Sequence, residues 1–305
     1  MTPRLDIQDH LATITLQRPE AANKLAPEDL GALVAHMEHI NHRDDVRVLV
    51  LRSEGKYFCS GYDISEIQGS QTEGSSFGEM VDAIEQWRAV TVAAIHGGVY
   101  GGATDMALAC DFRVGSTAAE MFMPAARLGL HFYAGGLERY VSRLGLDTAK
   151  RLFLTCERIQ APEMKACGFL THLADPAAFA AAVEQLTGTL AAMAPIPLFG
   201  MKKHLNLIAR GRHDVAEITR EVQRSIASED LQEGGRAWRE KRSPEFKGRG
   251  TASSRIPADC PWCCLPPTAH GTGAAQLGDT EEGPLPHRGC RPPLGEGAQR
   301  LRGYQ

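Results

Sequence analysis

Two glycine-marked turns, each preceded by a short apolar segment, constrain this chain most. The first is residues 56–64 (KYFCSGYDI), and the second is residues 94–111 (AIHGGVYGGATDMALACD). Each predicts a strand that ends in a turn and leads toward a helix. The first N–H groups of a helix lack acceptors within it and, with the helix dipole, favour negative charge. Glycine lets such a backbone approach a ligand closely, so two facing turns would form an oxyanion hole.

The rest of the chain predicts an α/β protein. Alternating and β-branched residues predict strands at 5–7, 11–16, 46–51, 91–95 and 111–114. Pro27, followed by two acids, predicts a helix start, since proline and negative charge both suit the first turn. Apolar periodicity predicts later helices at 136–144, 147–155, 162–167, 176–193, 198–209 and 215–228. Early strands followed by a helical last third indicate an α/β core with a helical C-terminal layer.

Composition and charge exclude several function classes. The chain has 305 residues and a net charge of −4, which gives no electrostatic reason to expect nucleic acid or an anionic membrane as partner. The first 16 residues lack the apolar stretch of a secretory signal, and no window approaches the ~18 apolar residues of a membrane span. We therefore expect a cytoplasmic protein.

The last segment, residues 251–305, differs from the rest in composition. It holds eight of the 17 prolines together with eight glycines, and such a segment buries too little apolar surface to offset its ordering entropy. We expect a Pro/Gly-rich disordered tail. Its Cys260, Cys263, His287 and Cys290 could be read as a zinc pattern, but their spacing matches no established zinc module.

The two turns, in this order and spacing, resemble the signature regions of the crotonase (enoyl-CoA hydratase/isomerase) superfamily. Residues 16–23 (LQRPEAAN) resemble its N-terminal motif, and residues 134–136 and 240–249 fit as well, so the resemblance covers residues 4–249. It implies a crotonase-like spiral of ββα units. The implied organisation is an α/β core over 1–195, a C-terminal helical trimerisation region over 196–250, and the tail over 251–305.

The resemblance also assigns the parts of the site. The oxyanion donors fall on the N–H groups of Tyr62 and Gly102, and Lys56 matches a lysine that meets the phosphates of coenzyme A. A thioester oxygen that gains enolate charge needs donors where that charge develops, each worth roughly 2.7–4 kcal/mol. The implied substrate-binding residues are Lys56, Ser60, Gly61, Tyr62, Asp63, Ile64, Gly101 and Gly102. Coenzyme A would enter as part of the substrate, without a separate cofactor or metal ion.

The acid–base residues depart from the family pattern. Its hydratases use two glutamates, and here the first position is Asp105 while the second is Ala125, which cannot titrate. Tyr133 lies where related isomerases and dehalogenases carry an aspartate, and His131 is nearby. We hypothesise that Asp105 is the main acid–base group, with Tyr133 and His131 as further catalytic candidates. The alternatives are that Asp105 braces its helix and that the other two only line the pocket.

Several functions are consistent with this pattern. The leading one is an enoyl-CoA hydratase-like lyase of fatty acid metabolism with a non-standard acid–base set, assembled as a trimer or a dimer of trimers. The alternatives are an enoyl-CoA isomerase or a degenerate member that binds acyl-CoA with little activity. A dinucleotide site is disfavoured because residues 97–102 are not G-x-G-x-x-G, and RNA binding because residues 27–41 contain no Lys or Arg. We expect residues 68–78 to form a mobile loop near the acyl pocket.

Overall fold

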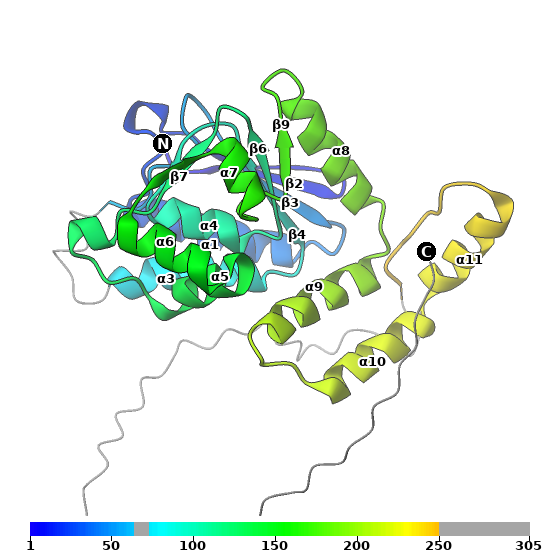
Figure 1. Cartoon of the computed structure of the whole chain (residues 1–305). Coiled ribbons are helices and arrows are strands. Elements are labelled where there is room, and N and C mark those ends of the chain that lie inside the picture. The colour runs from blue at the N-terminus through cyan, green and yellow to red at the C-terminus, as the bar shows by residue number, and fades with distance from the viewer. Residues whose placement is uncertain (64–72, 250–305) are drawn as a thin grey trace, which may run out of the picture. The chain divides into compact units, whose positions relative to one another are not determined.

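The computed structural model describes residues 1–63 and 73–249 (Figure 1), and it describes the side chains of residues 1–63 and 77–249. Its main sheet has six strands in the order β1-β2-β3-β4-β6-β9, and β1 is antiparallel to β2 while the other neighbours are parallel. The strands are β1 (Arg4–Gln8), β2 (Leu11–Leu16), β3 (Val48–Ser53), β4 (Val90–Ile95), β6 (Phe112–Ser116) and β9 (His172–Ala174). A second sheet joins β5 (Val99–Tyr100), β7 (Glu120–Phe122) and β8 (Arg158–Gln160) in that order.

Helices cover both faces of the main sheet. They are α1 (Pro27–Asn41), α3 (Glu73–Gln86), α4 (Gly102–Ala109), α5 (Ala134–Leu144), α6 (Leu146–Thr155), α7 (Ala161–Ala166), α8 (Phe179–Ala191), α9 (Pro195–Ala209), α10 (Val215–Ile226) and α11 (Glu229–Glu240). Short 3₁₀ turns occupy Pro19–Ala21 and Ala126–Leu128. On one face, Leu49 and Leu51 of β3 join a core with α1, α3, α4 and α5, and on the other face Val48 and Val50 pack toward α8.

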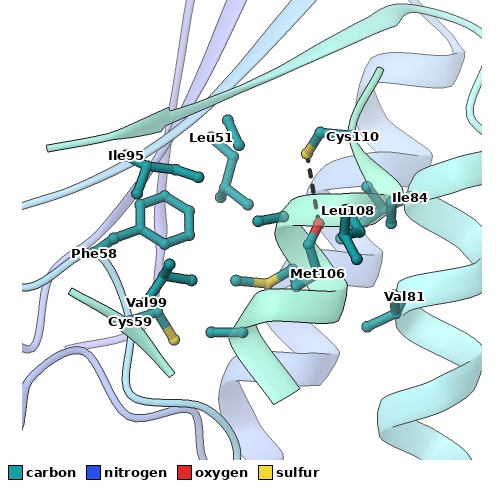
Figure 2. Packing of buried hydrophobic residues seen from close by; sticks show 14 of the residues in the cluster. Leu51, Phe58, Cys59, Val81, Ile84, Ile95, Val99, Met106, Leu108 and Cys110 are labelled. Atoms are coloured by element: carbon teal, nitrogen blue, oxygen red, sulfur yellow. Dashed lines mark hydrogen bonds between the residues drawn. The ribbon is translucent and has the colours of Figure 1, made fainter. Parts of the chain in front are cut away.

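Helix α4 lies in the middle of the larger core. Every residue from Ala103 to Ala109 is buried, so this helix is apolar on all sides except for Thr104 and Asp105. Figure 2 shows Met106 pointing toward Phe58 and Val99, and Leu108 pointing toward Ile84 of α3. Packing on all sides fixes the position of α4, and therefore also the position of the glycine turn from which it starts.

The structure confirms most of the predicted elements. Helix α1 begins at Pro27 as predicted, and the Asp29 carboxylate accepts the Ala26 N–H at 2.8 Å, which stabilises its first turn. β3 and β4 are buried on both faces, as expected for parallel strands between helix layers. Within residues 1–63 and 73–249, every helix is too short or too polar to span a bilayer.

Two predictions about the chain's organisation were wrong in part. The segment after Gly135 is not entirely helical, because β8 and β9 are short strands within it. These strands form by pairing with β7 and β6, and three residues are too few for a periodic signal in the sequence. The predicted loop 68–78 is helical from Glu73 onward, where it belongs to α3, and its earlier part lies outside the described residues.

Some predictions stay untested by the described part of the chain. The tail over 251–305, with its cysteines, lies outside it. The proposed division into a core over 1–195 and a trimerisation region over 196–250 likewise remains a prediction.

Candidate active site

The two glycine turns predicted from the sequence meet in the structure. Phe58 donates its N–H to the Gly98 carbonyl at 2.9 Å, and Tyr100 donates to the Cys59 carbonyl at 2.9 Å. Gly61 has φ +98°, and a Cβ placed on it would lie 3.1 Å from the Gly102 nitrogen. By standard bond lengths, the amide nitrogens of residues 62 and 102 then lie within roughly 7 Å of each other.

Local backbone geometry sets the direction of both amides. Leu25 donates to the Gly61 carbonyl at 2.8 Å and accepts from the Asp63 N–H at 3.0 Å. In an extended segment the backbone N–H and C=O groups of successive residues point to opposite sides. The Tyr62 N–H therefore points away from Leu25. Gly102 is the first residue of α4, where an N–H has no acceptor within the helix.

Both turns line one cavity of about 300 Å³. Among the described residues that line it, none is Asp, Glu, Lys or Arg, and most are apolar or aromatic. The lining residues are Ser60, Gly61, Tyr62, Phe77, Gly101, Gly102, Met123, Pro124, Ala125, Leu128, Leu130, His131, Phe132 and Tyr133. A mostly apolar cleft with a few convergent polar groups is the usual form of a small-molecule site.

Asp105 lies behind the wall of this cavity rather than in it. Its side chain has no exposed surface, and the Tyr133 hydroxyl, which belongs to a lining residue, donates to its Oδ2 at 2.5 Å. Arg139 donates to the same carboxylate through Nε, at 2.9 Å from Oδ1, and through Nη2, at 2.8 Å from Oδ2. The sequence predicted Asp105 beside the acyl chain, whereas in the structure Tyr133 lines the cavity and Asp105 lies behind it, bonded to the Tyr133 hydroxyl.

Arg139 is the part of the site that sequence reasoning missed. Its side chain is fully buried, and Nη1 also donates to Asp82 Oδ1 at 2.6 Å and to Glu85 Oε2 at 3.1 Å. The Glu85 carboxylate accepts in addition from Arg143 and from Arg210. The only signal in the sequence was an arginine just after the Ala134–Gly136 segment, which looks like any charged residue of an amphipathic helix.

Small residues at the start of α5 permit this arrangement. A Cβ on Gly136 would lie 3.0 Å from Asp105 Oδ2 and 2.2 Å from the Phe132 ring, and one on Gly135 would lie 2.5 Å from Asp82 Oδ1. The positive end of the α5 dipole therefore comes close to two carboxylates, which it stabilises.

Comparisons with known proteins agree with this geometry. The sequence model of the enoyl-CoA hydratase/isomerase family matches residues 6–249. The chain belongs to this family. It is 31% identical to human mitochondrial enoyl-CoA hydratase domain-containing protein 2 over 252 residues, which cover 78% of this chain and 86% of the relative. It is 28% identical to (E)-benzylidenesuccinyl-CoA hydratase of Thauera aromatica over 263 residues, which cover 81% of this chain and all of that protein.

The fold comparison gives the same result. The crystal structure of enoyl-CoA hydratase from Bacillus anthracis superposes with a TM-score of 0.75 at 28% identity and covers 82% of this chain and 100% of that one. The fold is therefore the crotonase fold, and the protein is a hydratase-like enzyme of the enoyl-CoA hydratase/isomerase family.

Ala125 and His131 both lie at the cavity. Ala125 lines it and is 4% exposed, so this wall carries a methyl group at the position where the sequence resemblance implies a glutamate in hydratases. His131 is exposed and lines the cavity, and its Nδ1 lies 2.8 Å from the carbonyl oxygen of the adjacent Phe132. Of the three sequence candidates, the structure therefore brings His131 and Tyr133 to the cavity.

The residues expected to bind coenzyme A lie along the first turn. Lys56 is exposed, with its Nζ 5.2 Å from the centre of the Tyr57 ring, and Asp63 forms an ion pair with Lys24. Ser60 lines the cavity. Ile64, which the sequence also assigned, lies outside the described residues.

The cysteine in this turn has a structural role. Cys59 has no exposed surface and its Sγ lies 3.0 Å from the Asn23 carbonyl oxygen. Burial raises the pKa of the Cys59 thiol to about 12, so it stays protonated and is not a nucleophile at neutral pH.

Proposed function

We propose that this enzyme adds water to the double bond of a 2-enoyl-CoA thioester through an enolate held by the N–H groups of Tyr62 and Gly102. The observation that carries the proposal is the meeting of the two glycine turns at one cavity, where a Cβ on Gly61 would lie 3.1 Å from the Gly102 nitrogen. Donors fixed by packing need no reorganisation when the thioester oxygen becomes anionic, and each contributes roughly 2.7–4 kcal/mol. Coenzyme A enters as part of the substrate, and the reaction needs no other cofactor.

The acid–base work is proposed for the side chains around Tyr133. Tyr133 lines the cavity and is hydrogen-bonded to Asp105, while His131 is exposed at the same wall. Isomerisation is the second candidate, and Ala125 favours it, because moving a double bond needs only one group that removes and returns a proton. Lys56 is proposed to bind the coenzyme A phosphates, and we propose a role in cytoplasmic fatty acid metabolism.

Turnover of the substrate and polarisation of its thioester carbonyl can be measured separately. With the full chain and crotonyl-CoA, we expect loss of the enoyl absorbance and appearance of 3-hydroxybutyryl-CoA by mass spectrometry. With a conjugated dienoyl-CoA, we expect a red shift of the bound ligand, because donors at the carbonyl oxygen pull electron density toward it. A 3-enoyl-CoA that is converted faster than crotonyl-CoA would make isomerisation the main reaction. Tight binding with neither red shift nor turnover would contradict the proposal and indicate a degenerate binding member.

We also propose that the chain assembles as a homotrimer, or as a dimer of trimers, through α9, α10 and α11. These helices expose large apolar side chains at helical spacing, which isolated monomers rarely do. On α9 they are Met201 (58% exposed), Leu205 (64%) and Ile208 (50%); α10 exposes Val215, Val222 and Ile226; and α11 exposes Leu231 and Trp238 (87%).

Leu205→Glu is expected to convert the assembly into monomers, because the introduced charge would have to be buried at every contact. The mass measured by light scattering after gel filtration checks this. Leu154→Glu, at a 72% exposed leucine on α6, is the matched control and should leave the mass unchanged. A monomeric wild-type protein, or an unchanged mass for Leu205→Glu, would contradict the assignment of this face.

A further inference from the structure

We infer that Tyr133 is the single side chain that transfers protons to and from the substrate, that Asp105 acts only through it, and that Arg139 positions Asp105. This inference rests on the proposed function. It explains how a family member with Ala125 in place of the second carboxylate can still perform both proton transfers of a hydration.

The hydrogen bonds define the protonation state of the pair. Asp105 accepts from Tyr133 at Oδ2 and from Arg139 at both oxygens, so it is an ionised carboxylate surrounded by donors. The phenolic proton therefore lies between Tyr133 and Asp105, and the phenolic oxygen keeps acceptor capacity for a water in the cavity. Burial and the neighbouring Asp105 charge raise the pKa of Tyr133 well above 10, so the phenol is neutral at physiological pH.

Arg139 keeps two other carboxylate partners while Asp105 briefly carries a proton. A buried arginine left without a counter-charge would be costly. Here its guanidinium also bonds Asp82 and Glu85 of α3, so two carboxylates still balance it when Asp105 carries a proton. Glu85 is itself balanced by Arg143 of α5 and by Arg210, which directly follows α9. Tyr140 of α5 is bonded to Thr104, the residue before Asp105.

The proton and electron balance of the two steps is complete. As water attacks Cβ, its proton passes to the Tyr133 oxygen and the Tyr133 proton passes to Asp105, while the double-bond electrons move to the thioester oxygen. The resulting enolate then takes the proton of Tyr133 at Cα, and Tyr133 recovers a proton from Asp105. The net change is addition of one water, with both new bonds on the face that Tyr133 presents.

The test separates the two proton transfers in one set of variants. Hydration is followed with crotonyl-CoA, and exchange of the Cα hydrogens with solvent deuterium is followed with butyryl-CoA, which cannot be hydrated. For Tyr133→Phe we expect both rates to fall by the same factor, about 10²–10⁴, with KM changed little. With two independent groups, one of the two rates would persist.

A second variant tests the positioning role of Arg139 without emptying the buried site. Asp82 is 39% exposed, and Asp82→Asn keeps an acceptor for Arg139 while removing one balancing charge. Arg139 then attracts the Asp105 charge more strongly, which makes transfer of the Tyr133 proton to Asp105 harder. We expect kcat to fall about tenfold while KM changes little. A variant with only a packing defect would change KM as well.

The outcomes separate this inference from the proposed function. A wild-type enzyme with neither red shift nor turnover would contradict the proposed function itself. A wild-type enzyme with both red shift and turnover would support the proposed function. Three results would then overturn the inference about Tyr133. These are a Tyr133→Phe variant that keeps more than a tenth of the hydration rate, loss of only one of the two proton transfers, or an unchanged kcat in Asp82→Asn.

Discussion

Arg139→Met is expected to lower the free energy of unfolding by about 3–5 kcal/mol, which is the usual cost of breaking a buried ion pair from one side. Arg139 has no exposed side-chain surface and bonds Asp105, Asp82 and Glu85. Methionine fills part of the volume of Arg139 but donates no hydrogen bond. Of the donors to the buried Asp105 carboxylate described above, Tyr133 then remains. Urea denaturation at one fixed protein concentration measures the change, since assembly would also stabilise the fold.

A surface arginine with two carboxylate partners provides the control. Arg151 pairs with Glu157 and Glu163, but its side chain is 41% exposed. Arg151→Met should lower the free energy of unfolding much less, because water replaces the lost partners and screens the charges. If the two variants differed by less than about 1 kcal/mol, the buried network would not have the energetic role that we assign to it.

The second large effect is expected at Gly97, where the two turns cross. A Cβ on Gly97 would lie 2.1 Å from the Lys56 carbonyl oxygen, and because that atom belongs to the backbone the two turns would have to separate. Gly97→Ala is therefore expected to lower the free energy of unfolding by about 1–3 kcal/mol. A displacement of about 1 Å at the oxyanion donors should also reduce kcat/KM by about 10²-fold.

Steady-state kinetics with crotonyl-CoA and urea denaturation check both parts of this prediction. The control is Gly188→Ala in α8, where a Cβ meets no atom within 4 Å. That variant should keep full activity and gain up to about 1 kcal/mol, because alanine favours a helix over glycine. Wild-type activity and stability in Gly97→Ala would show that the contact between the turns is not required.

The local sequence determined those features that depend on neighbouring residues. Pro27 and the acids after it define the start of α1, and the valine- and leucine-rich segments define β3 and β4. The glycines of the two turns also follow from local geometry: Gly61 has φ +98° and Gly101 has φ +54°, a backbone conformation that side chains disfavour. This pattern was sufficient to identify the family and the location of the cavity.

The tertiary structure alone decided where the candidate acid–base residues lie. Asp105 follows Gly102 by about one helical turn, so the sequence suggested a carboxylate at the acyl chain, but Arg139 on α5 draws it away from the cavity. Glu138 and Arg139 are adjacent charged residues of one amphipathic helix, and nothing local shows that Arg139 is buried while Glu138 meets Arg210 and Arg212 near the surface. Burial and ion pairing depend on segments distant in the chain, since α3, α4, α5 and the residue that follows α9 together supply the network. A periodic pattern records only which face of a helix is apolar.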